Sequence, residues 1–233
     1  MRGDRGSRRA RRSPFPDAAG RASLPVDRAS AWEGLYARGE DRWDIGGPSP
    51  PLVAVLARGE IGPPGRALVP GCGRGHDARM LAARGFEVVG VDFAPRAVRE
   101  ARREAAAAGV RGVRFERRDL FRLPRSYDGG FDLVFEQTCF CAIDPARRDE
   151  YARAVHRVLR PGGLLLGLFF DIRTEEGPPF GTTPAEIRHR FVASGLFRLE
   201  KARVPAESVA PRQGREWLAF LRKPVRGASF PGG

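Results

Sequence analysis

The sequence has few cysteines, few histidines and no long apolar segment. Its three cysteines are an odd number without small-domain spacing, so they do not indicate a disulfide framework. The longest apolar run, residues 164–170, has the length of a strand and falls far short of the ~20 residues that span a membrane. The three histidines lie far apart and near no cluster with metal-ligand spacing. We therefore expect no metal, no membrane partner, reduced thiols and a cytoplasmic location.

The formal net charge of +13 is carried almost entirely by arginine, because Lys201 and Lys223 are the only lysines. Eight arginines and three aspartates give residues 1–28 a charge of +5, which leaves +8 for the rest. Such a balance can indicate nucleic-acid binding. Here the arginines accompany abundant alanine, glycine and proline, so we interpret them as compositional bias and expect no nucleic-acid partner. Residues 1–28 lack a hydrophobic period and predict a disordered basic tail; residues 224–233 predict a flexible one.

The stretch from Leu68 to Asp77 combines a strand end, a glycine turn and a helix start. An apolar run ends in Gly71, Gly73 and Gly75, and helix-forming residues follow at once. Glycine permits positive φ and a close backbone approach to a ligand, and a helix start offers unpaired N–H groups. Taken alone this motif is a weak signal, because tight turns often contain glycine.

From residue 66 onward strands and helices alternate, which predicts an α/β fold with a doubly wound, mostly parallel, Rossmann-like sheet of seven strands. The last two strands have no helix between them and suggest an antiparallel addition at one edge. Aromatic residues at helical spacing predict a helical lid over residues 29–58, within a domain of residues 29–223. The expected strands are 67–70, 86–92, 113–119, 131–136, 164–170, 196–203 and 217–222.

Ligands of such folds bind beyond the carboxyl ends of the strands. Asp92 ends the second strand, where a carboxylate can accept hydrogen bonds from ribose hydroxyls. Asp119 ends the third strand and precedes the apolar Leu120 and Phe121, which fit an adenine slot. Glu136 ends the fourth strand. With the glycine turn, these residues indicate a site for an adenine nucleoside.

Two cofactor classes share this outline. Dinucleotide sites favour Gly-x-Gly-x-x-Gly, whereas here the third glycine comes one residue early. The turn at residues 92–94, the segment 118–121 and the Pro-Gly-Gly of 161–163 accompany it. Together they resemble class I S-adenosylmethionine-dependent methyltransferases. A nicotinamide enzyme and a non-catalytic nucleotide-binding module remain as alternatives.

Six motifs narrow the resemblance to the thiopurine S-methyltransferase family, and they look closer to its halide/thiol methyltransferase branch. The match runs from about residue 30 to 223. Most class I enzymes have an acid two residues before the first glycine; this chain has Val69, a departure that the family shares. The motifs are Trp43-Asp-Ile-Gly-Gly-Pro-Ser-Pro50, Leu68-Val-Pro-Gly-Cys-Gly-Arg-Gly-His-Asp77, Phe140-Cys-Ala-Ile-Asp-Pro145, Pro161-Gly-Gly163, Gly177-Pro-Pro-Phe180 and Arg212-Gln-Gly-Arg-Glu216.

The resemblance implies S-adenosyl-L-methionine as cofactor and assigns roles by position. Aromatic residues of the lid would cover the cofactor, with Tyr36 standing where the halide/thiol enzymes have a tryptophan. Gly71 would lie under the methionine part, and Glu136 near the amino group would supply the negative charge that Val69 lacks. The implied cofactor-binding residues are Trp32, Tyr36, Trp43, Gly71, Gly73, Gly75, Asp92, Asp119, Leu120, Phe121 and Glu136.

The resemblance also implies a small-molecule acceptor with a soft nucleophilic atom: a thiol, hydrosulfide, thiopurine-like group or halide. Such a nucleophile needs no strong general base, so positioning and desolvation can supply catalysis and no catalytic residue is assigned. Cys139, Phe140 and Phe180 are the expected substrate pocket. Arg173 or Arg212 could attract an anionic acceptor. Another acceptor remains an alternative, and we expect a monomer.

A Pro-Pro-Phe also occurs in DNA amino-methyltransferases, after the fourth strand and behind an Asp or Asn. Here Gly177-Pro-Pro-Phe180 follows the fifth strand and lacks that polar residue. The sequence therefore argues against methylation of DNA.

Overall fold

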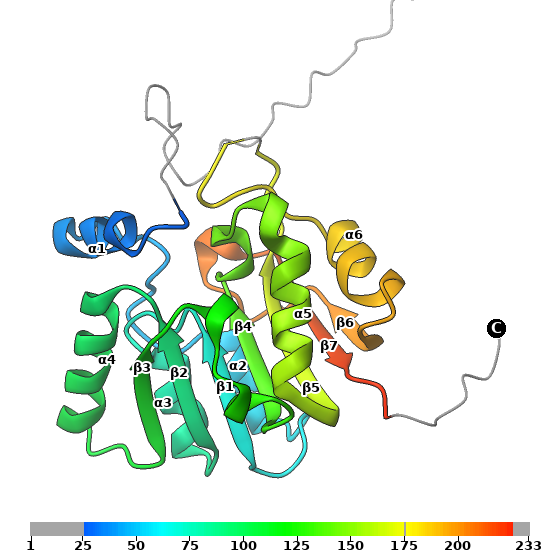
Figure 1. Cartoon of the computed structure of the whole chain (residues 1–233), viewed down its shortest axis with the longest axis horizontal. Coiled ribbons are helices and arrows are strands. Elements are labelled where there is room, and N and C mark those ends of the chain that lie inside the picture. The colour runs from blue at the N-terminus through cyan, green and yellow to red at the C-terminus, as the bar shows by residue number, and fades with distance from the viewer. Residues whose placement is uncertain (1–25, 175, 226–233) are drawn as a thin grey trace, which may run out of the picture.

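The computed structural model describes residues 26–174 and 176–225 (Figure 1). Almost all of the two expected tails, 1–28 and 224–233, lies outside the described residues, so their disorder stays a prediction. The described chain forms a sheet of seven strands, which confirms the predicted number. These strands are β1 (Arg66–Pro70), β2 (Glu87–Asp92), β3 (Val113–Arg117), β4 (Phe131–Gln137), β5 (Leu159–Phe170), β6 (Arg198–Arg203) and β7 (Glu216–Arg222).

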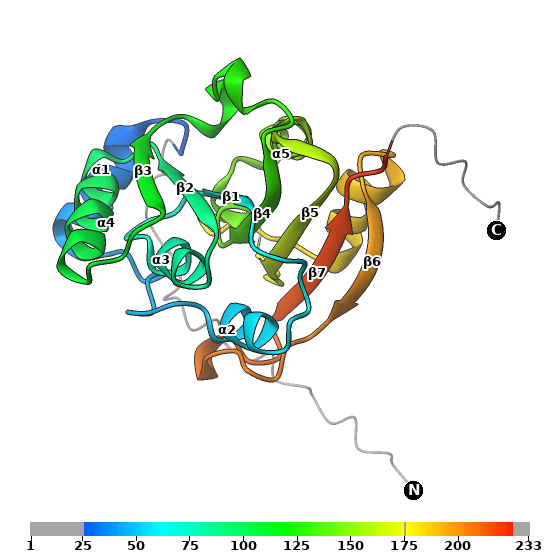
Figure 2. The same cartoon turned by 90° about the horizontal axis from the view of Figure 1, so that it is seen from below.

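Helices cover both faces of the sheet, as expected of a doubly wound fold (Figures 1 and 2). Apolar side chains of α2, α3 and α4 pack on one face, and those of α5 and α6 on the other. In the described residues no helix is both long and apolar enough to cross a bilayer. The helices are α1 (Ala29–Arg38), α2 (Pro50–Ala57), α3 (His76–Ala83), α4 (Pro95–Ala107), α5 (Arg148–Val158) and α6 (Pro184–Ile187), which continues into a π-helical turn (Arg188–Ala193).

The strand order is β3-β2-β1-β4-β5-β7-β6, and the first five strands along the chain are parallel. β7 runs antiparallel between β5 and β6, so the predicted antiparallel addition lies at this edge. Residues 204–215 connect β6 to β7 with one short helical turn (Ala210–Arg212) and no crossover α-helix, as is usual for antiparallel neighbours. The Pro-Gly-Gly of 161–163 falls within β5 rather than before it, next to a register shift of β4 between Phe131 and Leu133.

Residues 29–49, here called the N-terminal cover, cross the carboxyl ends of the parallel strands, where α1 lies beside the start of α4 (Figure 1). Glu33 fixes this position because its Oε2 accepts a hydrogen bond from the backbone N–H of Arg96 at 2.7 Å. The second half of the expected lid behaves differently. Leu52 and Val55 of α2 are fully buried in the core, so only the N-terminal cover overlies the site.

Candidate cofactor and acceptor site

A cavity of about 980 Å³ lies beneath the N-terminal cover, at the carboxyl ends of the parallel strands. Its wall includes Gly71 after β1, Asp92 at the end of β2, Asp119 after β3 and Thr138 after β4. After β1 the chain passes to one face of the sheet and after β4 to the other, which makes their junction the switch point where such folds bind ligands. Small-molecule sites measure roughly 300–1,000 Å³, so this cavity has room for a cofactor and a second small molecule.

Asp92 is the best-defined acceptor in the cavity. Its Oδ2 accepts from the N–H of Gly73 at 3.0 Å, and its Oδ1 accepts from the N–H of Ala94 at 2.9 Å. Burial raises the pKa of Asp92 to about 6, against the opposing effect of these backbone donors. Each carboxylate oxygen has two lone pairs, so both oxygens can still accept a hydrogen bond from a hydroxyl. The carboxylate is therefore held in place with free acceptor capacity.

The three glycines after β1 have different functions. Gly71 lines the cavity at φ +57°, and a Cβ there would lie 2.9 Å from Cys139 Sγ. Gly73 and Gly75, which the sequence placed among the cofactor contacts, are not in the cavity wall. Gly73 instead donates to Asp92, and a Cβ on Gly75 would lie 2.5 Å from the ring of Phe115. These two glycines shape the turn, and Gly71 presents its backbone to the cavity.

Leu120 and Phe121 line the cavity as expected for an adenine wall. Asp119 also lines it, and its Oδ1 accepts from the N–H of Phe121 at 2.9 Å, which fixes the start of this short turn. The sequence analysis missed Arg147. Its guanidinium carbon lies 3.6 Å from the centroid of the Phe121 ring, over its face. In an arginine-rich sequence nothing singled this residue out.

Three aromatic residues of the N-terminal cover also line the cavity: Trp32, Tyr36 and Trp43. The ring of Trp43 packs edge-on against Trp32 and Tyr36, with centroids 5.4 and 5.5 Å apart, and its Nε1 donates to the Tyr36 hydroxyl at 3.3 Å. Such edge-to-face packing fixes ring orientation. The three aromatic residues that the sequence singled out are thus brought together as one wall.

Glu136 does not lie where the sequence placed it. The residue is buried outside the cavity wall, and its Oε1 accepts from the N–H of Phe140 at 2.9 Å. Its Oε2 accepts from the hydroxyl of Tyr151 in α5. Burial raises the pKa of Glu136 to about 7. The expected contact with a cofactor amino group is therefore replaced by a structural one, which holds the turn after β4.

Neighbouring residues of the turn after β4 point in different directions, some into the cavity and one into the core. Cys139 and Cys141 line the cavity, as does Phe180. Phe140 points the other way into the core, where its ring contacts Tyr151 and other aromatic residues, so its expected place in the substrate pocket was wrong. Burial raises the pKa of the Cys139 thiol and brings that of Cys141 to about 12. Both sulfur atoms are therefore protonated near neutral pH.

Arg212 is a buried cation in the cavity wall, only 4% exposed. Its Nη2 donates to the backbone oxygen of Trp43 at 2.7 Å, and its Nη1 lies 3.6 Å from Glu216 Oε1. The motif at residues 212–216 was its only sequence signal, and the other candidate, Arg173, does not line the cavity. Among the residues that the structure describes, no three His, Cys, Asp or Glu side chains gather as metal ligands.

Known proteins of similar sequence and structure match the chain over most of its length. It is 33% identical over 198 residues to probable thiol methyltransferase 2 of Arabidopsis thaliana, which covers 84% of this chain and 85% of that one. It is equally 33% identical over 195 residues to thiocyanate methyltransferase 1 of Brassica oleracea, covering 82% and 84%.

The fold matches 1,6-didemethyltoxoflavin-N1-methyltransferase of Burkholderia thailandensis, solved with S-adenosylhomocysteine, at a TM-score of 0.68 and 22% identity. This match covers 88% of the chain and 92% of that structure. The sequence pattern of the thiopurine S-methyltransferase family matches residues 27–220. The chain therefore belongs to the thiopurine S-methyltransferase family.

Proposed function

We propose that this protein transfers a methyl group from S-adenosylmethionine to a small soft nucleophile, such as a thiolate, hydrosulfide, thiopurine-like group or halide. The observation that carries the proposal is the cavity itself, where a hydroxyl-binding acid, an adenine wall and an aromatic cover meet at the switch point. The described wall contains no histidine or lysine that could serve as a base. The thiol and thiocyanate methyltransferases among its relatives support an acceptor that attacks through sulfur.

The residues present fit this cofactor. Asp92 has lone pairs left for the two ribose hydroxyls, and Leu120 and Phe121 offer apolar surface for the adenine. Gly71 lets the backbone approach the methionine part, because a side chain there would collide with Cys139. When bound, S-adenosylmethionine supplies an electrophilic methyl group on a sulfonium centre.

The protein's part in the reaction is to position the cofactor and the acceptor, to exclude water from them and to stabilise the positive charge. The aromatic faces of Trp32, Tyr36 and Trp43 exclude water and favour a positive charge beside them. Glu136 holds the turn that carries Cys139 and Cys141, so the acceptor wall is rigid. The raised pKa values of these two cysteines keep their sulfur atoms from competing with the acceptor for the methyl group.

The acceptor is a small molecule rather than a nucleic acid in this proposal. Many arginines that make the chain basic are neutralised locally, as Arg114 is by Glu87 and Glu116 at 3.2 and 3.0 Å. Arg203 is similarly paired with Glu60 at 2.6 Å. Such arginines offer little free charge to a phosphate backbone. We further propose a cytoplasmic location and a monomeric state, and size-exclusion chromatography with light scattering would test the monomeric state.

Methyl transfer from labelled S-adenosylmethionine tests the function directly. The protein is incubated with iodide, hydrosulfide, an aromatic thiol, tellurite and bulk RNA in separate reactions, and the labelled product is identified. We expect label in the volatile or thioether products of the soft nucleophiles. Labelling of RNA alone would overturn the proposal and make the basic surface the functional one.

A further inference from the structure

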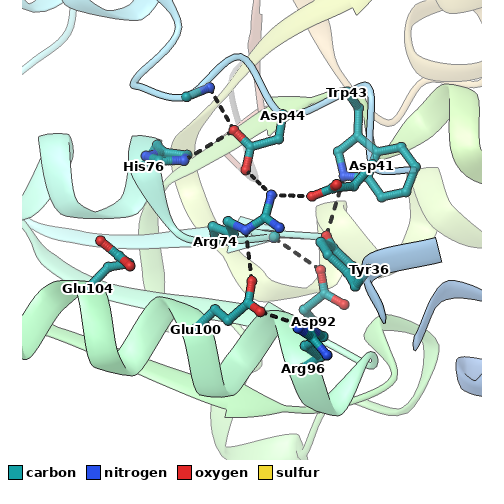
Figure 3. Close-up of polar contacts among 12 residues, drawn as sticks. Tyr36, Asp41, Trp43, Asp44, Arg74, His76, Asp92, Arg96, Glu100 and Glu104 are labelled. Atoms are coloured by element: carbon teal, nitrogen blue, oxygen red, sulfur yellow. Dashed lines mark hydrogen bonds and ion pairs between the residues drawn. The ribbon is translucent and has the colours of Figure 1, made fainter. Parts of the chain in front are cut away.

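The turn after β1 carries a charged side chain that the cavity does not use. Arg74 follows Gly73, is not part of the cavity wall, and lies between the N-terminal cover and α4 (Figure 3). Its Nη1 lies 2.7 Å from Asp44 Oδ2 and also donates to Asp41, both of the N-terminal cover. Its Nε donates to Glu100 Oε2 of α4 at 2.7 Å. One guanidinium therefore joins three parts of the chain.

These ion pairs differ from ordinary surface pairs in their burial. The side chains of Asp41 and Asp44 are only 8% and 12% exposed, and that of Glu100 is 14% exposed. Burial alone would raise the pKa of Asp44, but hydrogen bonds from His76 and Arg74 hold it well below its usual range. Exposed pairs contribute little, whereas shielded charges in a network are screened less by salt and water. The Arg74 network can therefore hold the N-terminal cover in place.

The Arg74 network contacts two parts of the cofactor site, the glycine turn beside Asp92 and the aromatic residues of the N-terminal cover. The N–H of Gly73, the residue before Arg74, donates to Asp92. Asp41 and Asp44 flank Trp43 of the aromatic wall, and the guanidinium carbon of Arg74 lies 5.7 Å from the centroid of the Tyr36 ring (Figure 3). Displacing Arg74 would loosen the aromatic cover and the turn beside the ribose-binding acid together.

We propose that Arg74 is a positioning residue that latches the N-terminal cover onto the glycine turn and thereby sets the affinity for the cofactor. The inference rests on the proposed use of S-adenosylmethionine. Without Arg74 the cover keeps other anchors, such as the hydrogen bonds of Ser49 to Asp77 and of Arg212 to Trp43. It would therefore stay attached but close less often, and the apparent Kd rises in inverse proportion to the closed fraction.

The variant Arg74→Gln tests the latch through two readouts. Calorimetry with S-adenosylhomocysteine should give a Kd about five- to tenfold higher, while kcat at saturating cofactor stays within about twofold, since the chemistry is untouched. Acrylamide should quench the tryptophan fluorescence of the cofactor-free variant more strongly. Trp32 and Trp43 lie in the cover, whereas the third tryptophan, Trp217, is a buried core residue.

Arg203→Gln is the matched control. The side chain of Arg203 is 32% exposed against 27% for Arg74, and it pairs with the shielded Glu60, which lies outside the N-terminal cover. This control should move neither readout. Asp44→Asn should weaken binding less in the Arg74→Gln background than in the wild-type protein, because the two changes share the Arg74–Asp44 contact while Asp44 also bonds His76 and Gly46.

If Arg74→Gln leaves both the affinity and the quenching unchanged, the proposed role of Arg74 is overturned. Equal changes in Arg74→Gln and Arg203→Gln would also overturn it, because they would indicate a general loosening of the protein. Failure of the wild-type protein to bind S-adenosylhomocysteine would contradict the proposed function instead. In that case the quenching of the cofactor-free proteins still decides whether Arg74 holds the cover.

Discussion

Replacing Asp92 with asparagine should weaken cofactor binding strongly. The substitution keeps the size of the side chain but removes the negative charge at the end of β2. A hydrogen bond to a charged group contributes about 1.5–3 kcal/mol, so weakening both ribose contacts costs about 3–4 kcal/mol, or about 100- to 1,000-fold in Kd. The same change places an amide N–H₂ against one of the N–H groups of Gly73 and Ala94, which adds to the loss.

The pH dependence of binding gives a second signature of Asp92. Its pKa of about 6 means that the carboxylate is ionised above pH 6 and protonated below it. Since the ribose hydroxyls bind the ionised form, the wild-type Kd should be constant above about pH 7 and rise toward tenfold per pH unit below about pH 6. Asp92→Asn has no such group and should show no rise from this site.

Calorimetric titration with S-adenosylhomocysteine between about pH 5 and 8 measures both effects. Asp132→Asn serves as a control, because Asp132 is bonded to Arg66 and Arg160 near the start of β4 and does not line the cavity. An Asp92→Asn variant that loses less than about tenfold in affinity would refute the assignment of this residue. A wild-type Kd that stays constant through pH 6 would refute the role of its charge.

Three further changes test other parts of the site. Glu136→Gln should raise the free energy of unfolding, measured in urea, by about 1–3 kcal/mol at pH 8. The reason is that the raised pKa of about 7 for Glu136 makes the stability of the wild-type protein fall as the pH rises from about 4.5 to 7. The gain in stability should therefore vanish near about pH 4.5. Gly71→Ala should lower the melting temperature more than Gly39→Ala, since both have positive φ but only Gly71 would collide, with Cys139. Phe121→Ala should weaken S-adenosylhomocysteine binding about tenfold in calorimetry by removing part of the adenine wall, and unchanged affinity would place the adenine elsewhere.

Strand-end reasoning located Asp92 and Asp119 in the cavity wall because parallel strands present their carboxyl ends at one edge of the sheet. The same reasoning misplaced Glu136, which is still inside β4, one residue before its end. Successive side chains of a strand point to opposite faces, so Glu136 meets Tyr151 of α5 instead of a ligand.

In the turn after β4, successive side chains likewise point in opposite directions. Cys139 and Cys141 face the cavity, while Phe140 between them fills the core. Arg74 and Arg147 were not predictable, because a long flexible side chain is placed by its tertiary partners and this sequence contains many arginines. The N-terminal lid was recognised from its aromatic residues, but the burial of α2 depends on contacts with the distant sheet.

The most direct test of the central claim compares an aromatic thiol with the phenol of the same skeleton as acceptors. No general base is assigned among the carboxylates and the tyrosine of the cavity wall, and the described wall has no histidine or lysine, so an acceptor that ionises readily should react best. We predict that kcat/KM for the thiol exceeds that for the phenol by at least about 100-fold, or about 2.7 kcal/mol of transition-state stabilisation. Equal or faster methylation of the phenol would contradict the account, because it would require one of the carboxylates or the tyrosine of the cavity wall to act as a general base.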